Sequence, residues 1–179
     1  MAKKICVIKT SLRLNSNSDQ LADAFIQGAK ESGNSVEEIS LKDKNIAFCK
    51  GCLACLKLGE CVIKDDANSI TEHIKQADVI VWATPIYYYE MSGQMKTFLD
   101  RLNPLYIADC QFKDVYLLAS AAEEDEYAMK RAKSGLEGWI ECFPQSHFAG
   151  SVFAGGMTNP GMAKESAAFE EARKAGMNV

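Results

Sequence analysis

The stretch Asp78-Val-Ile-Val-Trp-Ala-Thr-Pro85 places five consecutive apolar residues between an aspartate and a proline. An apolar run of this length without alternation is typical of a central parallel strand that is covered on both faces. Parallel strands need long crossover connections, which are usually helices. The stretch therefore predicts an α/β protein.

The chain on either side repeats a strand, loop and helix pattern. Residues 4–9 (KICVIK) form a short β-rich run, residues 10–18 are mostly polar, and apolar positions then recur at helical spacing until Gly33. Further strands are expected at residues 36–41, 113–120 and 147–153, and further helices at 66–77, 93–102, 126–143 and 163–175. Five strands alternating with helices predict a flavodoxin-like three-layer sandwich, with a five-stranded parallel sheet in the order 2-1-3-4-5.

Bulk properties limit the functions that this chain can have. Its 179 residues fit one flavodoxin-like domain over residues 1–179. The net charge of -4 and the lack of a basic stripe exclude nucleic acid as an expected partner. The N-terminus carries neither a signal-peptide core nor a membrane span, so we expect a cytoplasmic protein with no membrane partner and with reduced thiols.

Two polar loops should meet outside the carboxyl ends of strands one and three, where this fold binds ligands. The first offers the hydroxyls of Ser11, Ser16 and Ser18, the Asn17 amide and the Arg13 guanidinium at a helix N-terminus. These donors suit a phosphate, although a solvated loop with a helix cap would have a similar composition. The loop has no P-loop and no Gly-x-Gly-x-x-Gly motif, which disfavours an NTPase or a Rossmann site.

The second loop, residues 84–95, follows the most apolar strand. Pro85, Ile86 and the tyrosines Tyr87, Tyr88 and Tyr89 offer a flat apolar surface that suits a planar heteroaromatic ring. The tyrosines could equally be contacts between subunits, and we expect a homodimer or a higher homo-oligomer.

These loops resemble those of the NAD(P)H-dependent FMN reductase group of flavodoxin-like proteins. The resemblance rests on Ser11-x-Arg13-x-x-Ser16-Asn17-Ser18, Thr84-Pro-Ile-Tyr-Tyr, Ser92-Gly-Gln-Met-Lys96, Phe98-Leu-Asp-Arg101 and Ala154-Gly-Gly-Met. It implies that FMN phosphate is held by Ser11, Arg13, Ser16, Asn17 and Ser18, and the flavin ring by Pro85, Ile86, Tyr87 and Tyr88, with Ser120 and Ala121 on the other side of the ring. The chain departs from the group at Thr10, where glycine is common.

A short segment holds four of the seven cysteines of the chain. Cys49, Cys52, Cys55 and Cys61 follow the spacing Cys-x2-Cys-x2-Cys-x5-Cys. This spacing is similar to that of iron-sulfur flavoproteins, a branch of the same group, and by that resemblance it implies a [4Fe-4S] cluster. Zinc and unmetallated thiols remain alternatives. The other three cysteines, Cys6, Cys110 and Cys142, lie in apolar patterns and are expected in the core.

We therefore expect an enzyme, an FMN-dependent oxidoreductase that takes hydride from NAD(P)H and passes electrons to a small-molecule or protein acceptor. No side chain needs to act as a catalytic acid or base, because the cofactor carries the chemistry. The alternative is an iron-sulfur flavoprotein with FMN and a [4Fe-4S] cluster, which carries electrons from a ferredoxin-like protein. The sequence does not choose between NADH and NADPH and does not name the acceptor.

Overall fold

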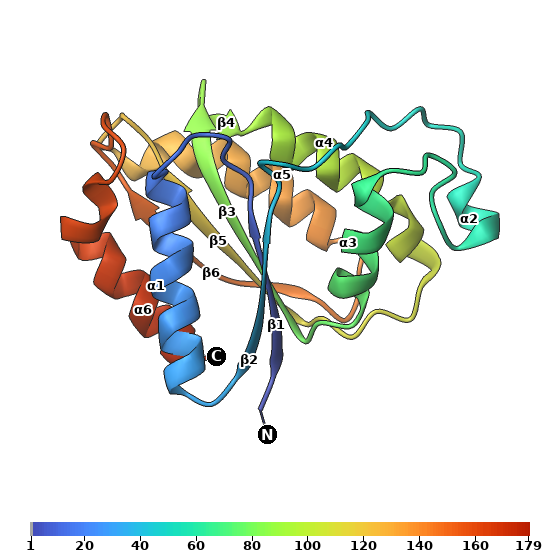
Figure 1. Cartoon of the computed structure of the whole chain (residues 1–179), viewed down its shortest axis with the longest axis horizontal. Helices are drawn as coiled ribbons and strands as arrows, with labels where there is room; N and C mark the ends of the chain where they lie inside the picture. The colour runs from blue at the N-terminus through green and yellow to red at the C-terminus, as the bar shows by residue number, and fades with distance from the viewer. Residues whose placement is uncertain (1) are drawn as a thin grey trace.

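A twisted parallel sheet forms the middle of the protein in the computed structural model, which describes residues 2–179 (Figure 1). The central strand β3 (Val79–Tyr87) pairs with β1 (Lys4–Lys9) and β5 (Asp114–Ser120), while β2 (Ser35–Ser40) and β6 (His147–Ala154) lie at the edges. The order β2-β1-β3-β5-β6 confirms the expected order 2-1-3-4-5 of the parallel strands.

A sixth strand, which the sequence did not predict, extends β3 at its carboxyl end. The two-residue strand β4 (Glu90–Met91) pairs antiparallel with Ile86 and Tyr87. The hairpin turn between them consists of Tyr88 and Tyr89, whose φ angles are 52° and 65°. Such left-handed turns usually contain Asn or Gly, so two tyrosines give no sequence signal for a hairpin.

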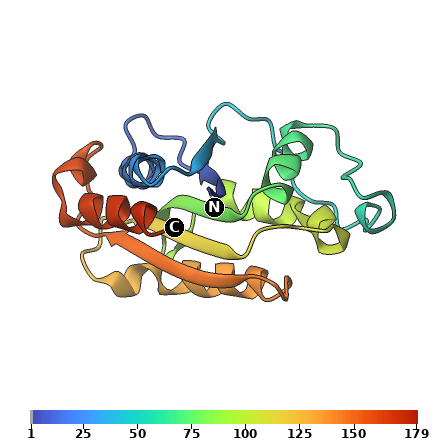
Figure 2. The same ribbon diagram turned by 90° about the horizontal axis from the view of Figure 1, so that it is seen from below.

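Helices cover both faces of the sheet, as Figure 2 shows. On one face, α1 (Asn17–Glu31) and α6 (Ala167–Met177) pack side by side on the β1 and β3 side chains that point to them. On the other face, α3 (Asp66–Lys75), α4 (Gly93–Arg101) and α5 (Lys130–Ile140) enclose a core around Trp82 of β3. Each face of β3 thus has its own apolar core, which explains why its sequence does not alternate.

Several short helical segments differ from the expectations. The helices expected from residues 126 and 163 each begin with a 3-10 turn, Glu126–Met129 (η2) and Met162–Glu165 (η3). Two more short helices, α2 (Cys55–Leu58) and η1 (Asn103–Ile107), were not predicted. Among the residues described, 2–179, no helix has the length and apolar character needed to cross a bilayer.

The three cysteines expected in the core divide into two groups. Cys6 and Cys110 are buried, but Cys142 is exposed, so the expectation for Cys142 was wrong. Cys142 lies in the turn after α5, between the exposed Glu141 and the buried Phe143. Burial raises the pKa of the Cys6 thiol to about 12, so this thiol stays protonated.

Candidate functional site

Hydrogen bonds from Thr10 join the carboxyl ends of β1 and β3. The backbone N–H of Thr10 and its hydroxyl Oγ1 both donate to the carbonyl of Ala83, each at 2.9 Å. The hydroxyl also lies 3.0 Å from Ser92 Oγ, at the start of α4. Thr10 is not among the residues with positive φ, so the loop needs no glycine here, and the threonine supplies a hydroxyl that a glycine would lack.

The loop after β1 leads into an N-terminus of α1 that has no side-chain cap. Ser16 is the N-cap residue of α1, yet its side chain does not cap the helix. Instead, Ser16 Oγ lies 3.0 Å from Ser18 Oγ, and Ser11 Oγ accepts from the Arg13 N–H at 3.2 Å. The first N–H groups of α1 are therefore free to bind an anion, which the helix dipole would favour.

The two predicted loops and the end of β5 line one pocket. Nine residues of the predicted set surround it: Ser11, Arg13, Ser16, Asn17, Pro85, Ile86, Tyr87, Ser120 and Ala121. Two others do not line it, since Ser18 is fully buried behind the loop and Tyr88 is 97% exposed at the hairpin tip. The pocket also includes Ala122, Met157 and Thr158, which were not predicted as site residues.

Asn17 connects this pocket to the loop after β6. Its side-chain Nδ2 donates to Asn159 O at 2.8 Å, and its Oδ1 accepts from Ala163 N at 3.1 Å. The Asn17 amide thus positions the segment that brings Met157 and Thr158 to the pocket. In the sequence, this segment is marked by Gly155. The structure has no room for a side chain there, because a Cβ atom would lie 2.4 Å from the Glu124 carbonyl oxygen.

The four clustered cysteines lie around a different pocket, which they share with Arg101 and Asn103. Figure 1 shows this loop and α2 at the end of the molecule opposite α1 and α6, and Figure 2 agrees. The cysteine pocket and the pocket at the strand ends have no lining residue in common. Within residues 2–179, no three His, Cys, Asp or Glu side chains are close enough to share a metal ion.

The cysteine loop contains two left-handed residues, and two of its sulfur atoms accept hydrogen bonds. Gly51 and Leu53 have φ angles of 62° and 56°, and a left-handed leucine is unusual. The Gly51 N–H donates to Cys49 Sγ at 3.4 Å, and Asn103 Nδ2 donates to Cys55 Sγ at 3.2 Å. Donors to sulfur are typical of thiolate-ligated iron sites, so the donor set fits a [4Fe-4S] cluster although the four sulfurs do not converge.

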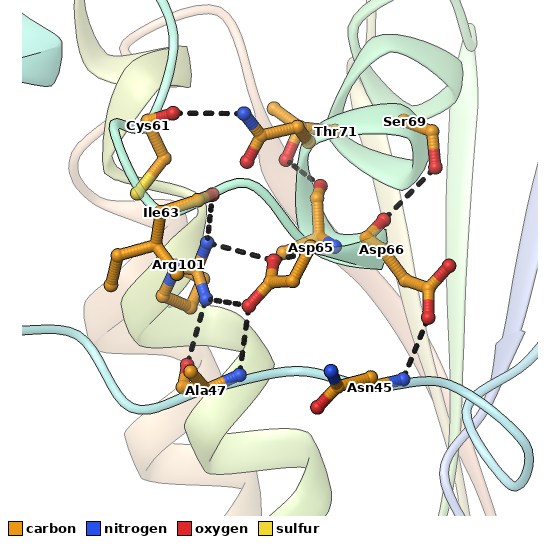
Figure 3. Close-up of polar contacts among 11 residues, drawn as sticks. Asn45, Ala47, Cys61, Ile63, Asp65, Asp66, Ser69, Thr71 and Arg101 are labelled. Carbon is orange, nitrogen blue, oxygen red and sulfur yellow. Dashed lines mark hydrogen bonds and ion pairs between the residues drawn. The ribbon is translucent and has the colours of Figure 1, made fainter.

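Arg101 and Asp65 form a buried ion pair at the base of this loop (Figure 3). Their side chains are 0% and 5% exposed and are joined by bonds of 2.6 and 2.9 Å. Burial alone would raise the pKa of Asp65, but the bonds from Arg101, Ala47 N–H and Ala67 N–H outweigh it, and the pKa is lowered. Burial would likewise lower the pKa of Arg101, but Asp65 and the neighbouring Cys61 raise it.

The two histidines take no part in either pocket. The Nδ1 atom of His73 lies 2.7 Å from Glu37 Oε1, and the Nε2 atom of His147 lies 3.3 Å from Asp114 Oδ1. Both side chains are about half exposed or more.

Comparison with known proteins identifies the family. Residues 3–159 match the family described as NADPH-dependent FMN reductase. The chain belongs to this family. The match to the NADPH-dependent FMN reductase family includes both polar loops and the cysteine segment.

Individual relatives differ in what their names record. An iron-sulfur flavoprotein from Archaeoglobus fulgidus is 37% identical over 94 residues, which are 52% of this chain and 43% of that protein. The putative NAD(P)H-dependent FMN-containing oxidoreductase YwqN from Bacillus subtilis is 29% identical over 85% of this chain and 82% of its own length. The matched part spans about half the length of the iron-sulfur flavoproteins.

A solved structure supports the fold. The NAD(P)H:quinone oxidoreductase from Methanothermobacter marburgensis superimposes with a TM-score of 0.81, covering 99% of this chain and 97% of its own, at 17% identity. At that identity the likeness concerns the fold alone.

Proposed function

We propose that the protein is an FMN-dependent oxidoreductase that accepts hydride from NAD(P)H and passes electrons to a small-molecule or protein acceptor. The observation that carries this proposal is that polar groups suited to an anion and flat apolar residues line one pocket at the carboxyl ends of β1, β3 and β5. Family membership supports the same reading. When bound, FMN supplies a ring that accepts hydride and releases electrons.

The residues of the pocket divide the work of binding. The free N–H groups of α1, with Ser11, Ser16 and Arg13, would hold the phosphate. Pro85, Ile86 and Tyr87 would position the ring, with Ser120 and Ala121 across from them. Asn17 would act through its bonds to the loop after β6, and Ser18 would support Ser16 from behind. Tyr88 would reach the ring only from the pocket's rim or from a partner subunit.

The proposal is tested by titrating FMN into apoprotein carrying Arg13→Ala. Loss of a charge-assisted bond to phosphate should weaken FMN binding by about 10- to 100-fold, and riboflavin, which has no phosphate, should bind both proteins equally. The titration follows the quenching of flavin fluorescence. Arg131→Ala, an exposed arginine on α5, is the matched control. An unchanged FMN affinity for the Arg13→Ala protein would contradict the phosphate assignment.

A second function is favoured by the four cysteines that line one pocket with N–H donors to two of their sulfurs. We propose as the alternative an electron carrier that holds FMN and a cluster ligated by Cys49, Cys52, Cys55 and Cys61 and is reduced by a ferredoxin-like protein. The name of the Archaeoglobus fulgidus relative is in line with this alternative. When bound, a [4Fe-4S] cluster supplies one-electron transfer.

The two functions are separated by the reductant. Anaerobic stopped-flow mixing with NADH or NADPH should bleach the bound flavin within turnover time if nicotinamide is the donor. Bleaching by reduced ferredoxin alone would favour the carrier. Iron and acid-labile sulfide measured on anaerobically purified protein then decide whether the cysteines hold a cluster.

Three further features belong to this proposal. We infer that residues 1–179 act as one FMN-binding domain in the cytoplasm, and that two or more copies associate through the tyrosine hairpin. Tyr87, Tyr88 and Tyr89 are each more than 40% exposed, although aromatic side chains are large and apolar. Exposed aromatic groups of this kind are typical of interface anchors.

A further inference from the structure

The fully buried Arg101 lies at the end of α4, in a place where a charged side chain is expensive. Two hydrogen bonds from its guanidinium to Asp65 offset part of that cost. Arg101 also lines the pocket of the four cysteines. A buried cation that faces a pocket of thiols calls for an explanation beyond helix packing.

The guanidinium joins the two ends of the cysteine loop. One amino group donates to Ala47 O at 2.8 Å, before the first cysteine, and the other donates to Ile63 O at 3.2 Å, after the last (Figure 3). Asp65 completes the closure by accepting from the Ala47 N–H at 2.9 Å. The loop is thus closed at its base before any ligand binds. The conformational entropy lost in closing the loop is lost when the protein folds, and ligand binding does not have to offset it.

A second pair of hydrogen bonds joins the same two segments, which flank the cysteine loop. Asp66 Oδ2 accepts from Asn45 N at 2.6 Å, and Asp66 N donates to Asn45 O at 3.2 Å. The left-handed residues Gly51 and Leu53 lie beyond these links, between the cysteines. The base of the loop is therefore held by hydrogen bonds, while the left-handed residues lie in the part that carries the sulfurs.

Arg101 retains a hydrogen-bond donor without a partner. Its Nε is buried and unpaired among the described residues, and Arg101 lines the same pocket as Cys61. A buried N–H without an acceptor is unfavourable, so an acceptor brought by a ligand would be favoured. Four thiolates around a metal cluster would bring negative charge and sulfur acceptors to this place.

We propose that Arg101, held by Asp65, is the positioning residue of the cysteine pocket, where it fixes both ends of the loop and balances the negative charge of a thiolate-ligated iron-sulfur cluster. This rests on the cluster in the alternative function above. Arg101 does not ligate iron. It acts through the loop ends and through the charge that it places near Cys61.

The test uses three variants of the full-length chain, with anaerobic reconstitution by ferrous iron and sulfide. Arg101→Lys keeps the positive charge but loses the planar guanidinium with its paired N–H donors. Arg101→Met loses both the charge and the donors. Asp65→Asn keeps an N-cap for α3 but loses the negative charge that pairs with Arg101. Iron and sulfide are measured per bound FMN, and the midpoint potential of the loaded fraction is measured by spectroelectrochemistry. FMN affinity, which depends on the other pocket, reports folding.

We expect Arg101→Lys and Arg101→Met to load the cluster at least about 10-fold more weakly than wild type, since residues behind a metal site commonly have that effect. Asp65→Asn leaves more positive charge near the cluster and should raise the potential, while Arg101→Met should lower it. A role in folding alone would not shift the potential in opposite directions. If Arg101→Met fails to bind FMN, Arg101→Lys and Asp65→Asn decide the question.

Two outcomes would overturn the inference, and they can be told apart. A wild-type chain that takes up no iron or sulfide refutes the cluster itself and leaves the FMN proposal intact. A loaded wild type whose Arg101→Lys and Asp65→Asn variants load equally well at an unchanged potential refutes only the role of Arg101.

Discussion

At the scale of single residues, polar groups around the loop after β1 serve the structure as well as a ligand. Thr10 joins β1, β3 and α4, and Asn17 holds the loop after β6. From the sequence, Asn17 was predicted to bind phosphate, and Thr10 was noted only as a departure from the related group. A residue in a ligand-binding loop can instead stabilise the fold, because its side chain and its backbone face different neighbours.

Asp19, in the first turn of α1, provides a pH-dependent prediction. Burial is the main cause that raises its pKa from 3.8 to about 6; Asp23 and Glu38 add to the rise, and Lys9 and Lys42 oppose it. Its Oδ1 is buried without a partner. The folded protein therefore binds this proton more tightly than the unfolded chain, and Asp19 destabilises the fold as pH rises through about 6.

We expect Asp19→Asn to be more stable than wild type at pH 7.5, with the difference disappearing as the pH falls toward 4. Urea unfolding at several pH values measures this. Asp43→Asn, an exposed carboxylate elsewhere on the chain, is the control and should show no such trend. A stability difference for Asp19→Asn that is the same at both ends of the pH range would contradict the burial argument.

At the scale of elements, the contact between α1 and α6 depends on two glycines. A Cβ at Gly28 would lie 1.9 Å from the Arg173 carbonyl oxygen, and one at Gly176 would lie 2.1 Å from the Phe25 carbonyl oxygen. The helix backbones approach each other directly at these points. Neither glycine has a positive φ, so the requirement is for space and not for backbone freedom.

Gly28→Ala should therefore lower the free energy of unfolding by about 1–3 kcal/mol, because two helix backbones must separate. Gly138→Ala is the matched control, since Gly138 also lies within a helix but has no atom within 4 Å of the added Cβ. It should be neutral or stabilising by up to about 1 kcal/mol through helix propensity. Thermal or urea unfolding compares the two, and equal effects would contradict the packing argument.

At the scale of the whole molecule, the proposed FMN pocket and the cysteine pocket lie in different places on one chain. The strand ends hold the first, and α4 leads from the tyrosine hairpin to the second. The hairpin itself projects from the carboxyl end of β3, with Tyr88 97% exposed. A surface of this kind is the place where we expect another copy of the chain to bind.

Tyr88→Asn should shift the protein toward the monomer, measured by light scattering after size-exclusion chromatography over a range of concentrations. Asparagine tolerates the positive φ of Tyr88, so the change removes the ring and not the turn. Tyr106→Asn, another exposed tyrosine, is the control. A wild-type chain that is monomeric at every concentration, or an unchanged oligomer for Tyr88→Asn, would refute the interface.

The sequence by itself determined the order of the parallel strands and the loops that meet at their ends. Apolar runs such as residues 79–83 record burial on both faces, and the carboxyl ends of adjacent parallel strands must lie together. The arrangement of Ser11, Arg13, Pro85 and Ile86 in one pocket follows from this rule, because it depends on local pattern and topology alone.

Only the tertiary structure decided what depends on contacts between distant parts of the chain. The ion pair of Arg101 with Asp65, the tyrosine hairpin and the separation of the cysteine pocket from the proposed FMN pocket belong to this class. A charge at the end of an amphipathic helix looks solvent-exposed in the sequence. It is buried here because the loop on either side of the cysteines folds over α4, and no local pattern encodes where a long loop comes to rest.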